Sequence, residues 1–539
     1  MTGGRVGYEK RFLHLAAALA VAAVGCSSSS DSSDNGSTKD PQGNPDGGGS
    51  GNPDPGSGWP GGTPNDGGTT PPVVEPKPAV KTFAELGVTP FDVDRDDLVG
   101  PSGWDAQYGK LPELVPAAGT SFVDVAVRNT NEAAGQIAVV RVEPDSAGTW
   151  HVTRGYKVRS LGNLLGFARG GDGSYYYATG SKDPDVTKTF PAPKQHRSNV
   201  LRALHFDSEG KTLFDVDIDI AREAANKASE PIVTPGRASS SRLSVAGNML
   251  ALVHGISTEP DGSGTRHQKA ASTFFDASTG AIRGTSSIWV SHSFDQRHLV
   301  DGNDIYEFHL GDAYPRAASI ARIRDSKSGE TQKAYRPKGD TGQNNTFTRL
   351  GNLVRIDAGP AKGSFLALLA TERTTDTSAL VSGSRDLALV RLTPDLAKGS
   401  DANIIDPSFG EESAVNSGGE NATNRLRYLT DYHTSAPGKT HAERPKFVPV
   451  GNGEFIVLYE EWALSGDKST YNGTFAMRID GEGTIRAAAT KVSQHHLPRG
   501  DDAFAYGGGA AWITGDKTKR ALTVHTVSAS LTAAEHVIP

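Results

Sequence analysis

The chain has 539 residues, with 55 Lys and Arg against 62 Asp and Glu, and a formal net charge of -7. This mildly acidic balance provides no basic surface that would neutralise a phosphate backbone, so we expect no nucleic-acid partner. A single cysteine excludes an internal disulfide and any CxxC metal or redox site. With 63 Gly, 31 Pro and only 3 Met, the composition favours many turns and short elements, and we expect an all-β fold.

The first 25 residues have the pattern of an export signal. Arg5, Lys10 and Arg11 precede an apolar run over residues 12–25, which is long enough for a signal-peptide core and too short to span a bilayer. The run ends in Ala23-Val24-Gly25-Cys26, which resembles the lipobox of bacterial lipoproteins. The resemblance implies a signal peptide over residues 1–25, cleavage before Cys26 and acylation of that cysteine with chains such as palmitate.

A lipid anchor on Cys26 would hold the mature protein at a membrane. Several acyl chains on one residue anchor firmly, because each buried methylene contributes about 0.8 kcal/mol. Ser27 follows the cysteine, and in the lipoproteins of Gram-negative bacteria the absence of Asp at this position implies transport to the outer membrane. The alternative is a plain secretory signal followed by a chance cysteine, but the only cysteine of the chain falls at the acylation position.

The composition of residues 26–80 predicts a flexible tether. They are almost wholly Ser, Gly, Asp, Asn, Pro and Thr, and such a segment cannot bury enough apolar surface to order itself. A Gly/Ser-rich coil of this length has a root-mean-square reach of about 40 Å. Apolar residues recur steadily from Phe83, so we expect the folded domain to occupy residues 81–539.

The folded part contains a repeated hairpin phrase. In it an alternating, half-apolar run ends in Asp, a few small residues and then Gly, which predicts a β-hairpin whose Asp caps the turn and whose Gly adopts a positive φ. The six copies have their turns at Asp145–Gly148, Asp207–Gly210, Asp276–Gly280, Asp325–Gly329, Asp395–Gly399 and Asp480–Gly483, and a degenerate seventh covers Leu522–Thr526.

The spacing of the copies predicts four strands per unit. Most gaps contain a second pair of apolar runs, such as Leu243–Val253, Ile305–Leu310 and Phe455–Tyr459. About seven four-stranded units indicate a seven-bladed β-propeller, in which stacked blades bury what one blade cannot. The segment Asp276–Gly280 resembles the hairpin of quinoprotein-like and related propeller repeats. The alternative is a set of tandem β-sandwiches with ordinary Asp/Gly hairpins.

A polar cluster recurs before the inner apolar run of several units. In a propeller, equivalent positions meet near the channel mouth, where several guanidinium groups would favour an anionic ligand. The candidate ligand-binding residues are His292, Asp295, Arg297, His441, Arg444, His496 and Arg499, with Arg242 and Arg349 in similar places. The alternative is that these residues join neighbouring blades through ion pairs with acidic residues such as Glu443, Asp501 and Asp502.

No familiar catalytic signature is present, since the sequence contains neither a GxSxG elbow nor an HExxH helix. Imidazole suits zinc or copper, but nothing fixes the mutual geometry of His292, His441, His495 and His496, and we expect no metal and no cofactor.

Three classes of function stay open. The favoured one is a noncatalytic, membrane-anchored propeller that binds a cell-envelope polymer, an anionic glycan, a small anion or a protein. The second is an envelope enzyme, such as a polysaccharide lyase, an esterase or another hydrolase, that uses the His/Arg cluster as acid, base and anion stabiliser. The third is a structural protein that docks envelope partners on a flat face.

Overall fold

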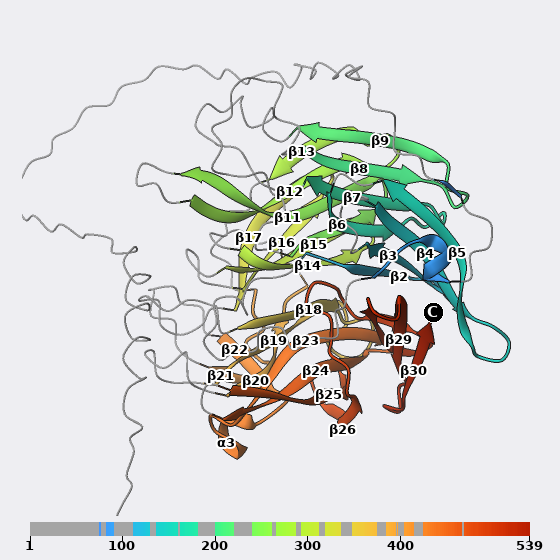
Figure 1. The fold of residues 1–539 in the computed structure, drawn as a ribbon. Helices are drawn as coiled ribbons and strands as arrows, with labels where there is room; N and C mark the ends of the chain where they lie inside the picture. Colours follow the sequence, from blue (N-terminus) through green and yellow to red (C-terminus); the bar gives the residue numbers. More distant parts are fainter. Residues whose placement is uncertain are drawn as a thin grey trace, which may run out of the picture. The chain divides into compact units, whose positions relative to one another are not determined.

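The half-apolar runs of the sequence form antiparallel strands in the computed structural model (Figure 1). The structure describes residues 75–76, 82–90, 111–129, 136–159, 162–181, 200–219, 240–260, 266–286, 293–311, 318–335, 348–373, 384–394, 396, 404–413, 424–465 and 468–539. Cys26, the expected signal peptide and His292 lie outside the described residues. None of the helices in the described part of the chain has the length and apolar character needed to cross a bilayer.

Seven antiparallel sheets follow one another along the chain, and each is built from one continuous stretch of it, apart from β1 in the first. The first three sheets contain β2 (Leu114–Ala118), β3 (Val123–Arg128), β4 (Gln136–Pro144) and β5 (Trp150–Arg159), with β1 (Glu75–Pro76) beside β5; then β6 (Gly162–Arg169), β7 (Tyr175–Ser181), β8 (Val200–Phe206) and β9 (Thr212–Asp219); then β10 (Arg242–Ala246), β11 (Met249–Pro260), β12 (Arg266–Asp276) and β13 (Ile282–Ser286).

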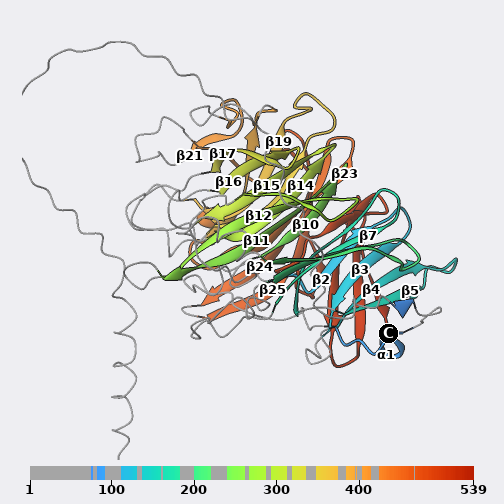
Figure 2. The same cartoon turned by 90° about the horizontal axis from the view of Figure 1, so that it is seen from above.

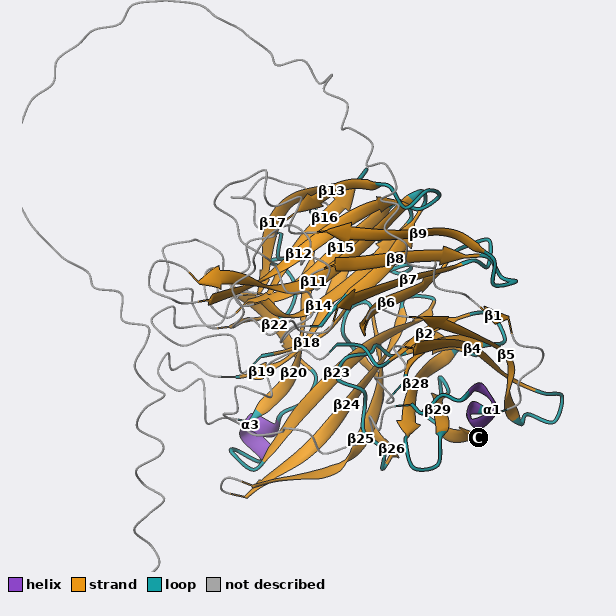
Figure 3. Cartoon of the chain, turned by 45° about the horizontal axis from the view of Figure 1, so that its top comes forward, coloured by secondary structure: helices purple, strands orange, loops and turns teal. Residues whose placement is uncertain are grey.

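The remaining four sheets continue the same order. They contain β14 (Ser293–Asp301), β15 (Asp304–Gly311), β16 (Ala318–Arg324) and β17 (Lys327–Tyr335); β18 (Arg349–Arg355), β19 (Phe365–Glu372), β20 (Arg385–Leu392), β22 (Asn424–Tyr428) and β21 (Glu411–Ser413); β23 (Thr440–Gly451), β24 (Glu454–Ser465), β25 (Lys468–Asp480) and β26 (Ile485–Ser493); and β27 (Phe504–Tyr506), β28 (Gly509–Asp516), β29 (Ala521–Val527) and β30 (Ala533–Ile538). The described helices are single turns, α1 (Phe83–Leu86) and α3 (Tyr432–Ser435), so strands dominate Figure 3.

The sheets are blades arranged in a ring. The first strand of each blade contacts the first strand of the next, from β2 through β6, β10, β14, β18 and β23 to β27, and β27 contacts β2 in turn. The protein is therefore a seven-bladed β-propeller whose first strands surround the centre. This confirms the predicted architecture, and the chain does not adopt tandem sandwiches.

Apolar packing between blades forms the core. Among the described residues, seven buried clusters occur, and each joins the facing sheets of two neighbouring blades. Between blades 4 and 5, for example, Phe308 and Ile320 pack with Phe365 and Leu369, all at most 1% exposed. A sheet with two apolar faces cannot stand alone in water, so each blade depends on its neighbours.

Where the structure describes the chain, the first and last blades close the ring without exchanging a strand. Blade 7 consists of the last four strands, and its seam with blade 1 buries Phe83 and Leu86 of α1 together with Ile513 and Ile538. The backbone N–H of Phe83 donates to the carbonyl of Pro539 at 3.3 Å, which places α1 beside the C-terminus (Figure 2). A capping box between Thr82 and Glu85 explains why this short helix forms here.

Four of the predicted Asp/Gly hairpins form as expected. At the β4–β5 turn, the Asp145 carboxylate accepts from the N–H groups of Ala147 and Thr149 at 2.8 and 2.9 Å, and Gly148 has φ 81°. The turns that begin at Asp207, Asp276 and Asp480 repeat this arrangement. The Asp side chain thus satisfies the turn donors, and Gly adopts a backbone angle that other residues rarely reach.

The fourth copy differs from its prediction. The β16–β17 turn consists of Asp325 and Ser326, with φ 51° and 61°, and Gly329 lies inside β17. Two successive positive φ angles are those of the tight hairpin turn that matches strand twist. The buried Ser326, whose N–H faces the Met249 sulfur at 3.3 Å, fixes this tighter register. Asp395 and Gly399 lie outside the described residues.

The seam between blades 1 and 7 should be sensitive to loss of apolar volume. Ile538→Ala removes a side chain that is 0% exposed, whereas Val537→Ala on the same strand removes one that is 61% exposed. We expect Ile538→Ala to lower the free energy of unfolding by about 2–5 kcal/mol and Val537→Ala to change it by less than about 0.5 kcal/mol. Chemical denaturation checks this. Equal effects of both variants would show that the seam does not limit stability.

Candidate functional site

Charged side chains gather where the first strands meet. They come from the starts of β10, β14, β18 and β23 and from residues 496–502, just before β27. Most are nearly or fully buried, and buried charges persist only when they are paired or hydrogen-bonded. The described residues form three groups, which we call the Asp502 cluster, the Glu443 cluster and the Glu460 cluster after the carboxylate that each surrounds.

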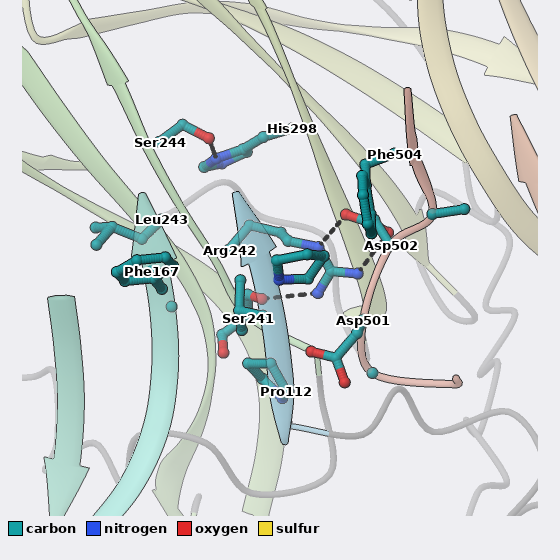
Figure 4. A pocket seen from close by; sticks show the side chains of 15 residues that line it. Pro112, Phe167, Ser241, Arg242, Leu243, Ser244, His298, Asp501, Asp502 and Phe504 are labelled. Atoms are coloured by element: carbon teal, nitrogen blue, oxygen red, sulfur yellow. Dashed lines mark hydrogen bonds and ion pairs between the residues drawn. The ribbon is translucent and has the colours of Figure 1, made fainter. Parts of the chain in front are cut away.

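The Asp502 cluster joins blade 7 to blades 3 and 4. Arg242 binds Asp502 in bidentate fashion, with Nε and Nη2 at 2.7 and 2.9 Å from the two carboxylate oxygens (Figure 4). Arg297 Nε lies 3.3 Å from Asp502 and its Nη1 pairs with Asp295. Burial opposes ionisation of Asp502, but the two guanidinium groups outweigh it and hold the pKa of the carboxyl well below its usual range.

Lys446 on β23 lies beside this cluster. It is 1% exposed, and its Nζ donates to the backbone carbonyl of Asp501 at 2.6 Å. Burial, reinforced by the charge of Arg297, lowers the pKa of Lys446 to about 7. The Asp501 carboxyl accepts from the N–H groups of Glu113 and Leu114 at 3.2 Å, and burial raises its pKa. Blade 7 is thus held to blade 1 through Asp501 and to blade 6 through Lys446.

The Glu443 cluster lies between blades 5 and 6. Glu443 on β23 is 3% exposed, pairs with Arg349 at 2.9 Å and also pairs with Arg385, which is 0% exposed. Burial raises the pKa of Glu443, but the two arginines reverse this and lower it to about 2. Burial and the nearby charges of Arg385 and Arg499, only partly offset by Glu443, lower the pKa of Arg349 to about 10.

His441 extends the Glu443 cluster. Its Nδ1 lies 3.4 Å from Arg385 Nη2 and its Nε2 lies 3.9 Å from Glu443. Burial and the charge of Arg385 lower the pKa of His441 to about 3. The imidazole is therefore neutral near pH 7 and adds no positive charge to the cluster.

The Glu460 cluster joins the inner strand of blade 6 to the segment before β27. One carboxylate oxygen lies 3.1 Å from Arg444 Nη1, 3.2 Å from His496 Nδ1 and 2.8 Å from the backbone N of Leu497. Trp462 Nε1 donates to the other oxygen at 2.8 Å. Glu460 is completely buried and each of its oxygens has a partner, which indicates a structural junction between blades 6 and 7.

The candidate residues predicted from the sequence divide among these clusters. Asp295 and Arg297 belong to the Asp502 cluster, His441 to the Glu443 cluster, and Arg444 and His496 to the Glu460 cluster. The half-buried Arg499 acts on Arg349 of the Glu443 cluster. The three acidic residues named from the sequence as blade-joining partners, Glu443, Asp501 and Asp502, do contact basic residues of other strands.

Sequence reasoning missed Arg385 and Glu460. Both lie on strands behind the innermost one and within runs that are otherwise mostly apolar, which reads as core. The sequence signal for both residues was a charged side chain within an otherwise apolar run, because a buried charge requires a partner. Among the described residues, no group of three His, Cys, Asp or Glu is arranged to hold a metal ion.

A small cavity of about 150 Å³ opens beside the Asp502 cluster (Figure 4). Its polar wall includes Ser241, Arg242, Ser244, His298 and Asp501. Its apolar wall is formed by Pro112, Val115, Pro116, Phe167, Leu243, Ala503 and Phe504. Ser244 and His298, a hydrogen-bonded pair in this wall, were not singled out in the sequence because they lie on different blades, 54 residues apart.

Comparisons with known proteins find solved structures that are distantly similar to this chain. No family model and no curated protein matches the chain. A protein from Lactobacillus plantarum is 11% identical, with a TM-score of 0.40, over 78% of this chain and 97% of its own. The acylaminoacyl peptidase of Pyrococcus horikoshii is 9% identical, with a TM-score of 0.36, over 83% of this chain and 52% of its own, so this chain spans about half its length.

The alpha-L-arabinanase of Cellvibrio cellulosa, in complex with arabinohexaose, is 8% identical with a TM-score of 0.28, over 60% of this chain and 93% of its own. Likenesses this distant carry no argument about activity. The fold rests on strand pairing, and the function must be argued from the residues.

The buried His441 should give the protein a distinct acid sensitivity. Its pKa falls from 6.5 to about 3 on folding, so between these values the unfolded chain binds a proton that the native chain does not. Stability is therefore lost as pH falls from 6.5 towards 3, and the slope of unfolding free energy against pH includes up to one proton from His441. We expect His441→Gln to remove this contribution.

Urea denaturation of the wild type and the variant at several pH values between 7 and 4 measures the slope. His433→Gln supplies the control, because it removes an exposed histidine that lies outside the Glu443 cluster. A His441→Gln slope equal to that of the wild type would mean that this imidazole is protonated in the native state.

Proposed function

We propose that this protein is a lipid-tethered propeller that binds an anionic ligand at the Glu443 cluster, without catalysis at that cluster. The observation that carries the proposal is that three arginines, Arg349, Arg385 and Arg499, influence one another around a carboxylate that is ion-paired with two of them. The cluster thus gathers three guanidinium groups at one junction between blades. A ligand that carries a carboxylate, sulfate or phosphate would accept hydrogen bonds from such guanidinium groups.

The hydrogen-bonding state of Arg385 supports this proposal. The side chain is completely buried, and its Nε and Nη1 have no hydrogen-bond acceptor among the described residues. A buried donor without an acceptor costs about 1–3 kcal/mol. An anion that reached this guanidinium would accept hydrogen bonds from these donors and remove that cost. Unused donors therefore favour the binding of an anion at this site.

The more accessible arginines define how the ligand would be recognised. The Arg349 side chain is 11% exposed, and Arg499 is half-buried, so both reach the solvent side of the cluster. Two planar guanidinium groups, each with several N–H donors, match planar oxyanions better than ammonium groups do. This geometry favours a carboxylate-bearing ligand, such as an anionic glycan or a small organic acid, over a neutral one.

The proposal places the propeller at the cell envelope. The lipobox-like sequence before Cys26 supports acylation there, and Ser27 supports transport to the outer membrane. The polar segment over residues 26–80 would then separate the binding face from the lipid, with a reach of about 40 Å. Such a tether allows a rigid binding domain to sample polymers or proteins near the membrane.

Binding can be tested with a double variant. We expect Arg349→Gln together with Arg499→Gln to weaken binding of trigalacturonate at least about tenfold, equivalent to about 1.4 kcal/mol. Isothermal titration calorimetry at fixed low salt measures the affinity, and maltotriose serves as the neutral ligand. Arg202→Gln is the matched control, because Arg202 pairs with Asp215 on outer strands of blade 2.

Inorganic phosphate in the same experiment separates a general anion site from a glycan site. Binding of phosphate without binding of trigalacturonate would support a general anion site and would contradict a glycan site. Absence of binding by trigalacturonate and by phosphate, or equal affinities in the wild type and the double variant, would refute the proposed site.

The anchor can be tested separately with Cys26→Ser. In a bacterial host supplied with labelled palmitate, we expect the wild type to carry the label and sediment with membranes, and the variant to lose both properties. Ser27→Ala is the control, because it leaves the acylated sulfur in place. A variant that still sediments wholly with membranes, with no fatty acid on either protein, would show that the proposed anchor is wrong.

A further inference from the structure

A serine, a histidine and a glutamate form a continuous chain across blades 3 and 4. Ser244 on β10 lies with its Oγ 3.0 Å from Nδ1 of His298 on β14. The other ring nitrogen of His298, Nε2, lies 3.5 Å from Oε1 of Glu307 on β15. His298 and Glu307 are opposite each other in the β14–β15 pair, and the packing of blade 3 against blade 4 adds Ser244.

The glutamate at the end of this chain is firmly held. Glu307 is 0% exposed, and the Ser272 hydroxyl lies 2.6 and 2.8 Å from its two oxygens. His309 Nε2 lies 3.3 Å from the same carboxylate. Because its neighbours surround it, the carboxylate can orient the His298 ring and stabilise positive charge on it.

The serine end of the chain faces a cavity. Ser244 and His298 line the cavity of about 150 Å³ described above, together with Arg242 and the apolar side chains of Phe167, Leu243 and Phe504. Figure 4 shows the Ser244–His298 hydrogen bond on the same side of the site as Leu243 and Phe167. A hydroxyl activated by imidazole, at the wall of a small and partly apolar cavity, is the arrangement that acyl transfer requires.

We propose that Ser244 is the nucleophile of a hydrolase that cleaves esters of short-chain carboxylic acids, with His298 as the general base and Glu307 as the residue that positions it. The Ser244 oxygen attacks the ester carbonyl carbon while its proton passes to Nδ1 of His298. The carbon–oxygen bond to the alcohol then breaks, and the alcohol leaves with that proton. Water repeats the sequence on the acylated serine, which releases the acid and restores the free hydroxyl.

The protonation states of the three groups agree with these roles. Burial lowers the pKa of His298, and Glu307 only partly opposes this, so the imidazole is neutral and can accept a proton. Burial raises the pKa of Glu307, but the two histidines outweigh it and lower it to about 2, so the carboxylate is ionised. The proposed mechanism uses the tautomer with its hydrogen on Nε2, 3.5 Å from Glu307 Oε1, and a lone pair on Nδ1 facing Ser244.

The size of the cavity sets the substrate class. A volume of about 150 Å³ accommodates a short acyl group rather than a long chain or a folded peptide. Phe167, Leu243 and Phe504 would contact the alkyl part of the acyl group. Arg242, held by Asp502 in the same wall, adds positive charge that acts on His298 and helps to lower the pKa of that imidazole.

The test uses the full chain and a small serine-directed reagent, diisopropyl fluorophosphate. We expect peptide mass spectrometry to find one adduct on Ser244, and none in Ser244→Ala. His298→Gln should slow the labelling of Ser244 at least about 100-fold, which is the low end of general-base effects. The matched control is Ser493→Ala, because the Ser493 hydroxyl bonds a glutamate directly, without an intervening histidine. That variant should be labelled like the wild type.

Turnover provides the second measurement. We expect hydrolysis of p-nitrophenyl acetate to exceed that of p-nitrophenyl octanoate and to disappear in Ser244→Ala. A wild-type protein without an adduct on Ser244 would overturn the proposal, whether or not the variants fold. So would a His298→Gln protein labelled at the wild-type rate. Loss of this activity leaves the anion site intact, because Ser244 lies outside the Glu443 cluster.

Discussion

Closure of the ring is the constraint on which the rest of the structure depends. Six of the seven interfaces join blades that follow one another in the chain, but the seam between blades 1 and 7 joins residues separated by most of the sequence. None of the described strands crosses this seam, and side-chain packing around Phe83 and Ile538, with the contact of α1 with the C-terminus, holds it together. Ordering the chain ends is entropically costly, and buried apolar area must offset that cost.

The charged centre follows from the same geometry. The first strands converge, so their side chains are desolvated whether they are apolar or not, and each buried arginine must meet a carboxylate. Asp502 and Glu460 meet this demand for their clusters, and they join the segment before β27 to blades 3 and 4 and to blade 6, respectively. Glu443 is shared between two arginines, with a third nearby.

The architecture was largely predictable because the propeller repeats a local signal. The turns at Asp145, Asp207, Asp276 and Asp480 each depend on residues within five positions, and their count and spacing indicate the number of blades. The turn at Asp325 was mispredicted because the burial of Ser326, a tertiary effect, selects a shorter loop. The local sequence around Asp325 does not indicate which of the two loop lengths forms.

The site was less predictable, because its contacts cross from blade to blade. Arg297 and Arg499 were found as polar residues before apolar runs, but the partners Arg385 and Glu460 lie on strands that read as core. Within the Ser244–His298–Glu307 chain, His298 and Glu307 belong to one hairpin, but the contact of Ser244 with His298 joins two blades over 54 residues. Such a chain becomes visible only when the register between blades is known.

The contact between Phe83 and Pro539 also bears on how this fold could be rewired. Each blade is a continuous stretch of chain, and the two ends of the ring meet at a single place. A short peptide that joined them, combined with a new break in an exposed turn of another blade, would yield a circular permutant with every sheet intact. In that permutant a covalent link would replace the noncovalent closure, and a different pair of blades would become the weakest junction.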